Sequence, residues 1–148
     1  QQVVKGFAKG DKTQVSLGAV QLFGPFLRSA QSLLAVDLGW VYFSDLPNGH
    51  PADSGSWGYR LSASTSFEGV LGGLGVQPRL IWTHDFKGTG AGPAVAFVEK
   101  RKSITAGLAL NYNNRWTASL SYTSFFDGKP LNLLADRDFM SFNLTFYY

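Results

Sequence analysis

The 148-residue sequence contains no cysteine. Disulfide bonds and thiolate metal sites are therefore excluded, while the redox compartment stays open. The sequence also has no apolar run of about 18 residues, so a membrane-spanning helix is excluded as well. The other fold that satisfies every backbone N–H and C=O group inside lipid is a closed β-barrel.

Charged residues are scarce and aromatic residues are abundant. Asp, Glu, Lys and Arg make up 16% of the chain, against about a quarter in a typical soluble domain. The 12 Phe, 6 Tyr and 4 Trp residues recur along the whole chain, which indicates a surface that meets lipid. The mean hydropathy is only −0.03, as expected where apolar and polar residues alternate. The net charge of +3 is modest, and no basic stripe with interleaved aromatic residues is present, so no nucleic-acid partner is predicted.

Segments that alternate with a period of two dominate the chain, and helical periodicity is absent. The predicted strands are residues 13–24, 32–43, 57–68, 74–86, 103–112, 116–126 and 140–148. Two positions break the pattern. The alternation slips near Gly18, which predicts a β-bulge there. Pro78 donates no hydrogen bond, so it predicts a local defect within its strand.

The connections between these strands alternate in length. Residues 25–30, 69–73 and 113–115 form short turns, whereas 45–56, 87–96 and 127–136 are longer and rich in Gly, Pro and Asp. Short periplasmic turns and long external loops are typical of outer-membrane barrels. The sequence therefore predicts an all-β fold, an antiparallel up-and-down transmembrane β-barrel whose C-terminus is periplasmic.

The number of strands leaves two interpretations. Seven strands are clear, but bacterial single-chain barrels usually have an even number. Residues 1–8 would supply a short eighth strand, which makes residues 1–148 one barrel domain. The alternative is that the chain is the C-terminal part of a larger barrel. The chain begins with Gln1 rather than Met and shows no signal peptide, which indicates a processed chain or a fragment.

Several motifs indicate a family. The end of the chain, with Phe142, Leu144, Phe146 and Tyr148, resembles the last-strand signal that the barrel assembly machinery recognises. The other motifs are Phe23-Gly24-Pro25, Ser56-Trp57-Gly58-Tyr59-Arg60-Leu61, Gln77-Pro78-Arg79, His84-Asp85, Phe97-Val98-Glu99, Asn114-Arg115-Trp116, Ser121-Tyr122-Thr123, Asn132-Leu133-Leu134 and Asp136-Arg137-Asp138-Phe139. From about residue 13 onward, the chain resembles the C-terminal portion of an uncharacterised family, a domain of unknown function, of Gram-negative outer-membrane β-barrel proteins. The resemblance implies a gene beside RND-type exporters, and therefore a periplasmic or RND exporter component as a partner. It carries over no site residues, because the family has no established biochemical function.

Four charged residues are expected on the inner face of the barrel. Asp37, Arg60 and Arg79 point inward on three consecutive strands, and Asp85 belongs to the inner set of its strand. One interpretation is a constriction that selects anions, as charged rings do in pores. The other is a network of ion pairs that fills a lumen too narrow for water.

A basic group is expected at the external rim. Lys100, Arg101 and Lys102 lie where a long loop re-enters a strand, and Arg137 lies in the last long loop. These side chains are candidates for contact with the phosphates of lipopolysaccharide, and a solvated rim is the alternative.

No catalytic site is predicted. His84 and Asp85 are adjacent in a strand, so their side chains face opposite sides and Asp85 cannot orient the His84 ring. No cofactor or metal site is predicted either.

The sequence thus predicts a non-enzymatic protein of the Gram-negative outer membrane. It would act as a narrow channel, or as the outer-membrane partner of an exporter of hydrophobic compounds. The expected partners are outer-membrane lipid and lipopolysaccharide, the barrel assembly machinery and an exporter component. The alternatives are a structural barrel with a filled lumen, a lipid-modifying barrel enzyme, and a soluble lipocalin-like barrel that holds a ligand inside.

Overall fold

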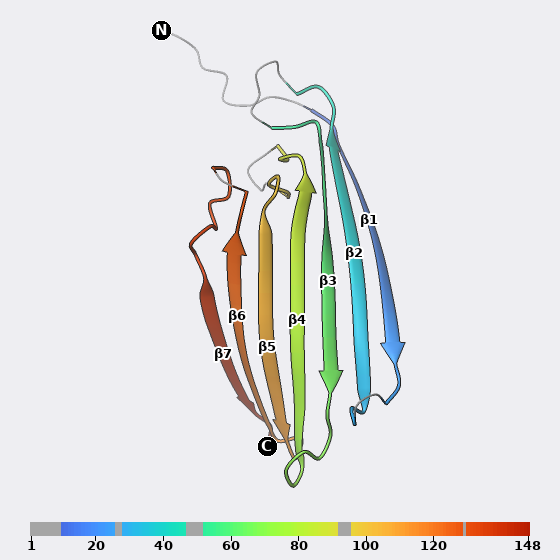
Figure 1. Cartoon of the computed structure of the whole chain (residues 1–148), viewed down its shortest axis with the longest axis vertical. Helices are drawn as coiled ribbons and strands as arrows, with labels where there is room; N and C mark the ends of the chain where they lie inside the picture. The colour runs from blue at the N-terminus through green and yellow to red at the C-terminus, as the bar shows by residue number, and fades with distance from the viewer. Residues whose placement is uncertain (1–9, 26–27, 47–51, 92–95, 129) are drawn as a thin grey trace.

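A computed structural model describes residues 10–25, 28–46, 52–91, 96–128 and 130–148. These residues form one antiparallel sheet in which each strand pairs with the next along the chain (Figure 1). The strands are β1 (Lys12–Phe23), β2 (Gln31–Phe43), β3 (Gly55–Ser66), β4 (Leu74–Lys87), β5 (Lys102–Tyr112), β6 (Trp116–Phe126) and β7 (Phe139–Phe146). In the described part of the chain, no helix is long and apolar enough to cross a membrane.

The seven predicted strands are confirmed, and their ends agree with the prediction within two residues. Differences of two residues occur in β3, which ends at Ser66 rather than Glu68, and in β7, which ends at Phe146 rather than Tyr148. Beyond Ser66, Phe67 forms only an isolated bridge with Val76, and the chain then turns through Gly69 and Gly72, both with positive φ.

The pairing registers separate the side chains into two chemically different faces. Ser64, Arg79, Gly107, Ser121 and Ser141 form one continuous row across β3–β7. We call this side the polar face. The adjacent row lies on the other side and contains Leu34, Ala63, Leu80, Ala106, Tyr122 and Met140. We call that side the apolar face.

The predicted bulge near Gly18 is wrong. β1 pairs with β2 over its full length without a register shift. The slip in polarity arises because the edge strand places Val20 and Leu22 on the polar face, where both remain more than half exposed. The register shift of this sheet lies instead between Trp57 and Gly58, where β3 meets β4.

Pro78 interrupts one ladder of hydrogen bonds but not the other. Pairing between β3 and β4 stops at Ser64 and resumes as the bridge between Phe67 and Val76, whose backbone groups exchange two hydrogen bonds of 2.8 Å. In an antiparallel ladder, hydrogen-bonded pairs recur every two residues, so the next such pair after Phe67 and Val76 is Thr65 and Pro78. The Thr65 carbonyl oxygen would accept the N–H group of residue 78, which proline lacks. Pairing of β4 with β5 continues through Pro78. The predicted local defect is therefore confirmed.

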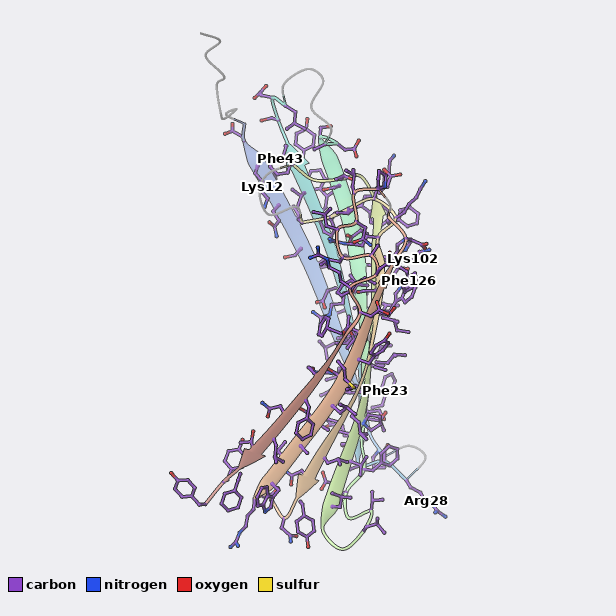
Figure 2. The ribbon with its side chains drawn as sticks, turned by 90° about the vertical axis from the view of Figure 1, so that its left-hand side faces the viewer. Lys12, Phe23, Arg28, Phe43, Lys102 and Phe126 are labelled. Atoms are coloured by element: carbon purple, nitrogen blue, oxygen red, sulfur yellow. The ribbon has the colours of Figure 1, made fainter. Side chains whose placement is uncertain are left out.

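The sheet is open in the described residues. β1 and β7 form its two edges and make no contact with each other. Since each strand is antiparallel to the next, β1 and β7 run in the same direction, as their arrows show in Figure 1. Seen from the side, the sheet is strongly twisted (Figure 2), as antiparallel sheets are. The expected closure into a barrel is thus not formed by the described residues, and the expected eighth strand, residues 1–8, lies outside them.

Replacing Pro78 with Val restores a backbone donor opposite the Thr65 carbonyl oxygen. We expect the free energy of unfolding to rise by about 0.5–1.5 kcal/mol, the net value of one hydrogen bond. Urea titration followed by tryptophan fluorescence measures the change. Pro130→Val, in an exposed loop, is the control, and an equal effect of both substitutions would contradict the assignment.

Candidate functional site

The most closely packed part of the molecule lies on the polar face, at the end of the sheet that carries the long loops. Among the described residues, the buried apolar side chains are Val41 in β2, 1% exposed, and Val98 in the β4–β5 loop, 5% exposed. Val41 shares the polar face with Gly39 and Asp37. Residues 96–101 of the loop therefore fold back onto the polar face, which the sequence pattern did not predict.

Phe97 lies against two glycines that face each other across β2 and β3. Gly39 and Gly58 are direct partners in the register. A Cβ atom on Gly39 would lie 2.9 Å from Cζ of Phe97, and a Cβ atom on Gly58 would lie 3.0 Å from Cδ1 of the same ring. Real Cβ contacts are longer than 2.9 Å, so a side chain at Gly39 would displace the ring. At Gly58 an added Cβ atom would also lie 2.8 Å from the backbone oxygen of His84. We call Gly39, Gly58 and Phe97 the glycine seat.

An ion pair anchors residues 96–101 beside the glycine seat. Arg101 Nε donates to Oδ2 of Asp85 at 2.7 Å, and the Asp85 side chain is only 3% exposed. The same carboxylate oxygen accepts the backbone N–H of Val98 at 3.0 Å. The Asp85 backbone adds two hydrogen bonds, one from its N–H group to the Arg101 carbonyl at 2.9 Å and one to its carbonyl from the Lys100 N–H at 2.8 Å. Breaking a buried pair by removing one partner is strongly destabilising, which makes Asp85 the main anchor of this segment.

Thr89, near the start of the β4–β5 loop, connects residues 96–101 to the loop between β2 and β3. Thr89 exchanges hydrogen bonds with Asp53, from its N–H group to Oδ2 at 2.7 Å and from the Asp53 N–H to its carbonyl at 2.8 Å. Thr89 Oγ1 also accepts the Glu99 N–H at 3.1 Å. Gly88 has a φ of 78°, and a Cβ atom there would collide with the Gly55 carbonyl oxygen. Glycine is therefore required where the chain turns away from β4.

The predicted inner charge cluster lies on the polar face but divides into separate parts. Asp37 and Arg60 are direct partners across β2 and β3, both are exposed, and no ion pair joins them within the described residues. Arg79 lies further along the face, in a hollow of about 430 Å³ lined mainly by small residues such as Ser64 and Ser121. Asp85 is bound to Arg101, so Arg60, Arg79 and Asp37 remain as the exposed charges of the predicted cluster, two positive and one negative.

The four residues of the predicted external rim also separate. Lys100 and Lys102 line an outward hollow of about 620 Å³ beside His84. Lys102 Nζ lies 2.8 Å from Oδ2 of Asp127, and Figure 2 labels Lys102 beside its strand partner Phe126. Arg101 is instead bound to Asp85, and Arg137 is exposed in the loop before β7. Contact with lipopolysaccharide stays a prediction.

His84 and Asp85 face opposite sides, as the alternation predicted. His84 lies on the apolar face, where its Nδ1 is 3.3 Å from the Tyr59 hydroxyl group. No group of three or more metal-ligating side chains occurs in the part of the chain that the structure describes. Near the last loop, the Tyr122 hydroxyl donates to Asp138 at 2.6 Å. This bond, followed by the Phe125 N–H, holds the pKa of Asp138 below its usual value.

The residues of the predicted assembly signal lie on one side of the last strand. Phe142, Leu144 and Phe146 share the apolar face of β7, and Tyr148 follows the end of the strand. All four side chains are exposed. This placement agrees with the predicted alternation, and recognition by an assembly factor stays a prediction.

Sequence reasoning did not find the glycine seat. Gly39 and Gly58 lie at inner positions of two predicted strands, but only the register between those strands reveals that they are partners. Phe97 lies in a loop, and no periodicity indicates which face of a sheet a loop residue contacts.

Substitution of Gly39 with Ala tests the seat. The new methyl group overlaps the Phe97 ring, and overpacking of this kind costs about 1–3 kcal/mol. We expect residues 96–101 to detach more often, so that chymotrypsin cleaves after Phe97 roughly tenfold faster for each 1.4 kcal/mol lost. Gly55→Ala is the matched control, because a Cβ atom there meets nothing within 4 Å. Equal cleavage rates in the two variants would show that the ring does not depend on the seat.

Comparison with known proteins gives one result. The sequence model of a family described as "Protein of unknown function (DUF1302)" matches residues 1–147. The chain belongs to this family, and the match begins before residue 13, where the motifs placed its start. No curated protein and no solved structure matches the chain.

Proposed function

We propose that this family member forms the wall of a narrow, water-filled channel in the outer membrane of a Gram-negative bacterium, and that it is not an enzyme. The observation that carries the proposal is the separation of the two faces. Large apolar side chains are exposed on the apolar face of every strand, from Leu17 in β1 through Leu80 in β4 to Phe142 in β7. A soluble protein rarely exposes a continuous apolar surface of this extent.

The dimensions of the sheet support a membrane setting. Six of the seven strands contain 11–14 residues, and a spanning strand needs about 9–11. Aromatic rings on the apolar face gather near its two ends, as aromatic belts do at membrane interfaces. At the end with the long loops, the ring of Trp82 contacts Phe126 at 5.7 Å. At the other end, Trp116 contacts Phe146 at 4.5 Å.

A sheet in lipid must also be closed. Each backbone group left unpaired in lipid costs several kcal/mol, so the outer edges of β1 and β7 need partners. β1 and β7 run in the same direction and cannot pair antiparallel with each other. Antiparallel closure therefore requires an odd number of further strands between them. Two copies that share one orientation in the membrane do not meet this requirement, because β7 of one copy would then lie parallel to β1 of the other.

The side chains of the polar face favour an open lumen over a filled one. On β3–β7 they are mostly small and hydroxylated: Ser62, Ser64, Thr105, Gly107, Ala109, Thr117, Ser119, Ser121, Thr123, Ser141, Asn143 and Thr145. Neighbouring hydroxyl groups bond to each other, as at 2.9 Å between Thr105 and Thr123 and at 2.7 Å between Ser121 and Ser141. In a small barrel, the side chains must be large enough to fill the interior. Small hydroxyl side chains instead leave room for water.

One observation favours the second candidate, a structural barrel with a filled lumen. The packed residues under the β4–β5 loop occupy the polar face at one end, and a loop seated there would obstruct a narrow lumen. The two candidates differ in conductance, since a filled barrel folds in a membrane but passes no ions. Partnership with an exporter and lipid-modifying activity stay predictions, because no contact among the described residues bears on either.

A pair of arginine substitutions tests the membrane setting. Leu120 lies in the middle of β6 on the apolar face, and its neighbour Ser119 lies on the polar face. In lipid vesicles, Leu120→Arg should lower the free energy of unfolding by roughly 2–4 kcal/mol, because it places a charge in lipid. Ser119→Arg, which points to the water-filled side, should change it by much less. Denaturant titration of both variants in vesicles gives the comparison. Equal small effects, with the protein monodisperse in plain buffer, would contradict a membrane protein.

The excess of arginine on the polar face predicts anion selectivity. In planar bilayers under a salt gradient, the reversal potential should show preference for anions. Arg60→Gln and Arg79→Gln should each shift the potential toward cations, because each removes a cation from the wall. Asp37→Asn is the control and should shift it in the opposite direction. A folded protein that inserts but carries no current would instead support the filled barrel.

A further inference from the structure

We propose that residues 96–101 are the built-in constriction of this channel and that Phe97 narrows the path at Arg60, where small anions pass. This inference rests on the proposed channel function and adds the position of its narrowest point. It concerns the described part of the β4–β5 loop and the polar-face residues of β2, β3 and β4 that this part contacts.

The position of the Phe97 ring on the polar face is the first support. Strand residues at polar-face positions point into the space that the sheet would enclose, and the glycine seat belongs to this set. Because Gly39 and Gly58 have no side chains, the ring approaches the backbone of β2 and β3 closely. An aromatic side chain from a loop thus replaces two strand side chains at this level. A loop held against the inner wall reduces the open cross-section.

The neighbouring charges are the second support. Two residues further along β2 and β3, about 7 Å away at the usual rise of a strand, Asp37 lies opposite Arg60 on the same face. The Arg60 side chain is exposed, and no ion pair holds it within the described residues. A solute that passes Phe97 therefore next meets the free guanidinium group of Arg60, with the exposed carboxylate of Asp37 on the neighbouring strand. Pores use this combination, a steric narrowing beside a charged residue, to select ions.

The anchor is the third support. Residues 96–101 are held on the polar face by the Asp85 carboxylate, through Arg101 Nε at 2.7 Å and the Val98 N–H at 3.0 Å. Val98, one of the two residues bonded to Asp85, is itself 5% exposed. The Arg101 guanidinium also donates to the Ala96 carbonyl at 3.2 Å, which closes the segment on itself. Such a network keeps a constriction in one place, so the current through it should be steady while the Asp85–Arg101 pair is intact.

Single-channel recording of the full chain in planar bilayers tests the constriction. Phe97→Ala should raise the unit conductance by roughly twofold or more, because a ring at the narrowest point is removed. Asp85→Asn should add open-channel noise, since the segment is then released from its anchor. Phe86→Ala is the matched control, because it also removes a phenyl ring. Phe86 lies near the end of β4, but its side chain is exposed on the apolar face. This substitution should leave the conductance unchanged. A heat-dependent shift in electrophoretic mobility verifies that each variant is folded.

Chemical labelling gives a second readout that does not depend on Asp85→Asn folding. The chain has no native cysteine, so Phe97→Cys and Phe86→Cys each provide one unique thiol. Methanethiosulfonate reagents added to the open channel should reduce the current of Phe97→Cys and not that of Phe86→Cys. A negatively charged reagent should react severalfold faster than a positively charged one at position 97, because Arg60 is near. The added change Arg60→Gln should abolish this difference.

The outcomes separate the two proposals. If the wild-type chain conducts and Phe97→Ala matches it, the constriction is wrong and the channel stands. If the wild-type chain is silent and Phe97→Ala conducts, both proposals are supported, and the constriction closes the channel at rest. If both are folded in the bilayer and silent, the channel proposal fails and the constriction fails with it.

Discussion

Side-chain alternation in a single-layered sheet is the constraint on which this structure depends. Each strand directs neighbouring side chains to opposite faces, and no second layer covers either face in the described residues. The apolar side chains of β1–β7 therefore have no protein core to enter. Val41 and Val98 are the buried exceptions among the described residues. Val98 belongs to the β4–β5 loop, and Val41 lies on the polar face onto which that loop folds. Something outside the described residues must cover the apolar face, and the proposed membrane function assigns that part to lipid.

The same constraint explains the chemistry at the loop-rich end. A carboxylate that is almost fully buried needs a partner, because burial of an unpaired charge is very costly. Asp85 finds this partner in Arg101, which belongs to the returning half of the β4–β5 loop. The bond directs the loop onto the polar face and brings Phe97 to Gly39 and Gly58. One ion pair in this way holds the returning half of the loop on the polar face of the sheet.

The direction of the edges limits how the sheet can be completed. Seven consecutive antiparallel strands leave β1 and β7 pointing the same way. This parity does not depend on curvature or on side chains, so it holds for any antiparallel barrel built around this sheet. The small hydroxyl residues of the polar face are also better suited to a wall around water than to the packed interior of a minimal barrel.

The alternation in the sequence was enough to predict the seven strands within two residues at each end, the antiparallel order and the residues of each face. These follow from local chemistry, because a period of two gives every strand its inner and outer side chains without reference to its neighbours. The local defect at Pro78 followed for the same reason, since proline lacks a donor wherever it lies. The supposed bulge at Gly18 was wrong because Val20 and Leu22 lie on the polar face of an exposed edge strand, where their polarity is weakly constrained.

Only the tertiary structure decided the rest. The glycine seat requires the register between β2 and β3, which places Gly39 opposite Gly58. Asp85 and Arg101 were predicted to belong to different clusters, but the path of the β4–β5 loop brings them together as an ion pair. The sequence did not predict this path, because loops have no periodicity. The open edges likewise depend on how far the sheet curves, a property summed over all seven strands. Local alternation determined which way each strand residue faces, and long-range pairing determined what it meets there.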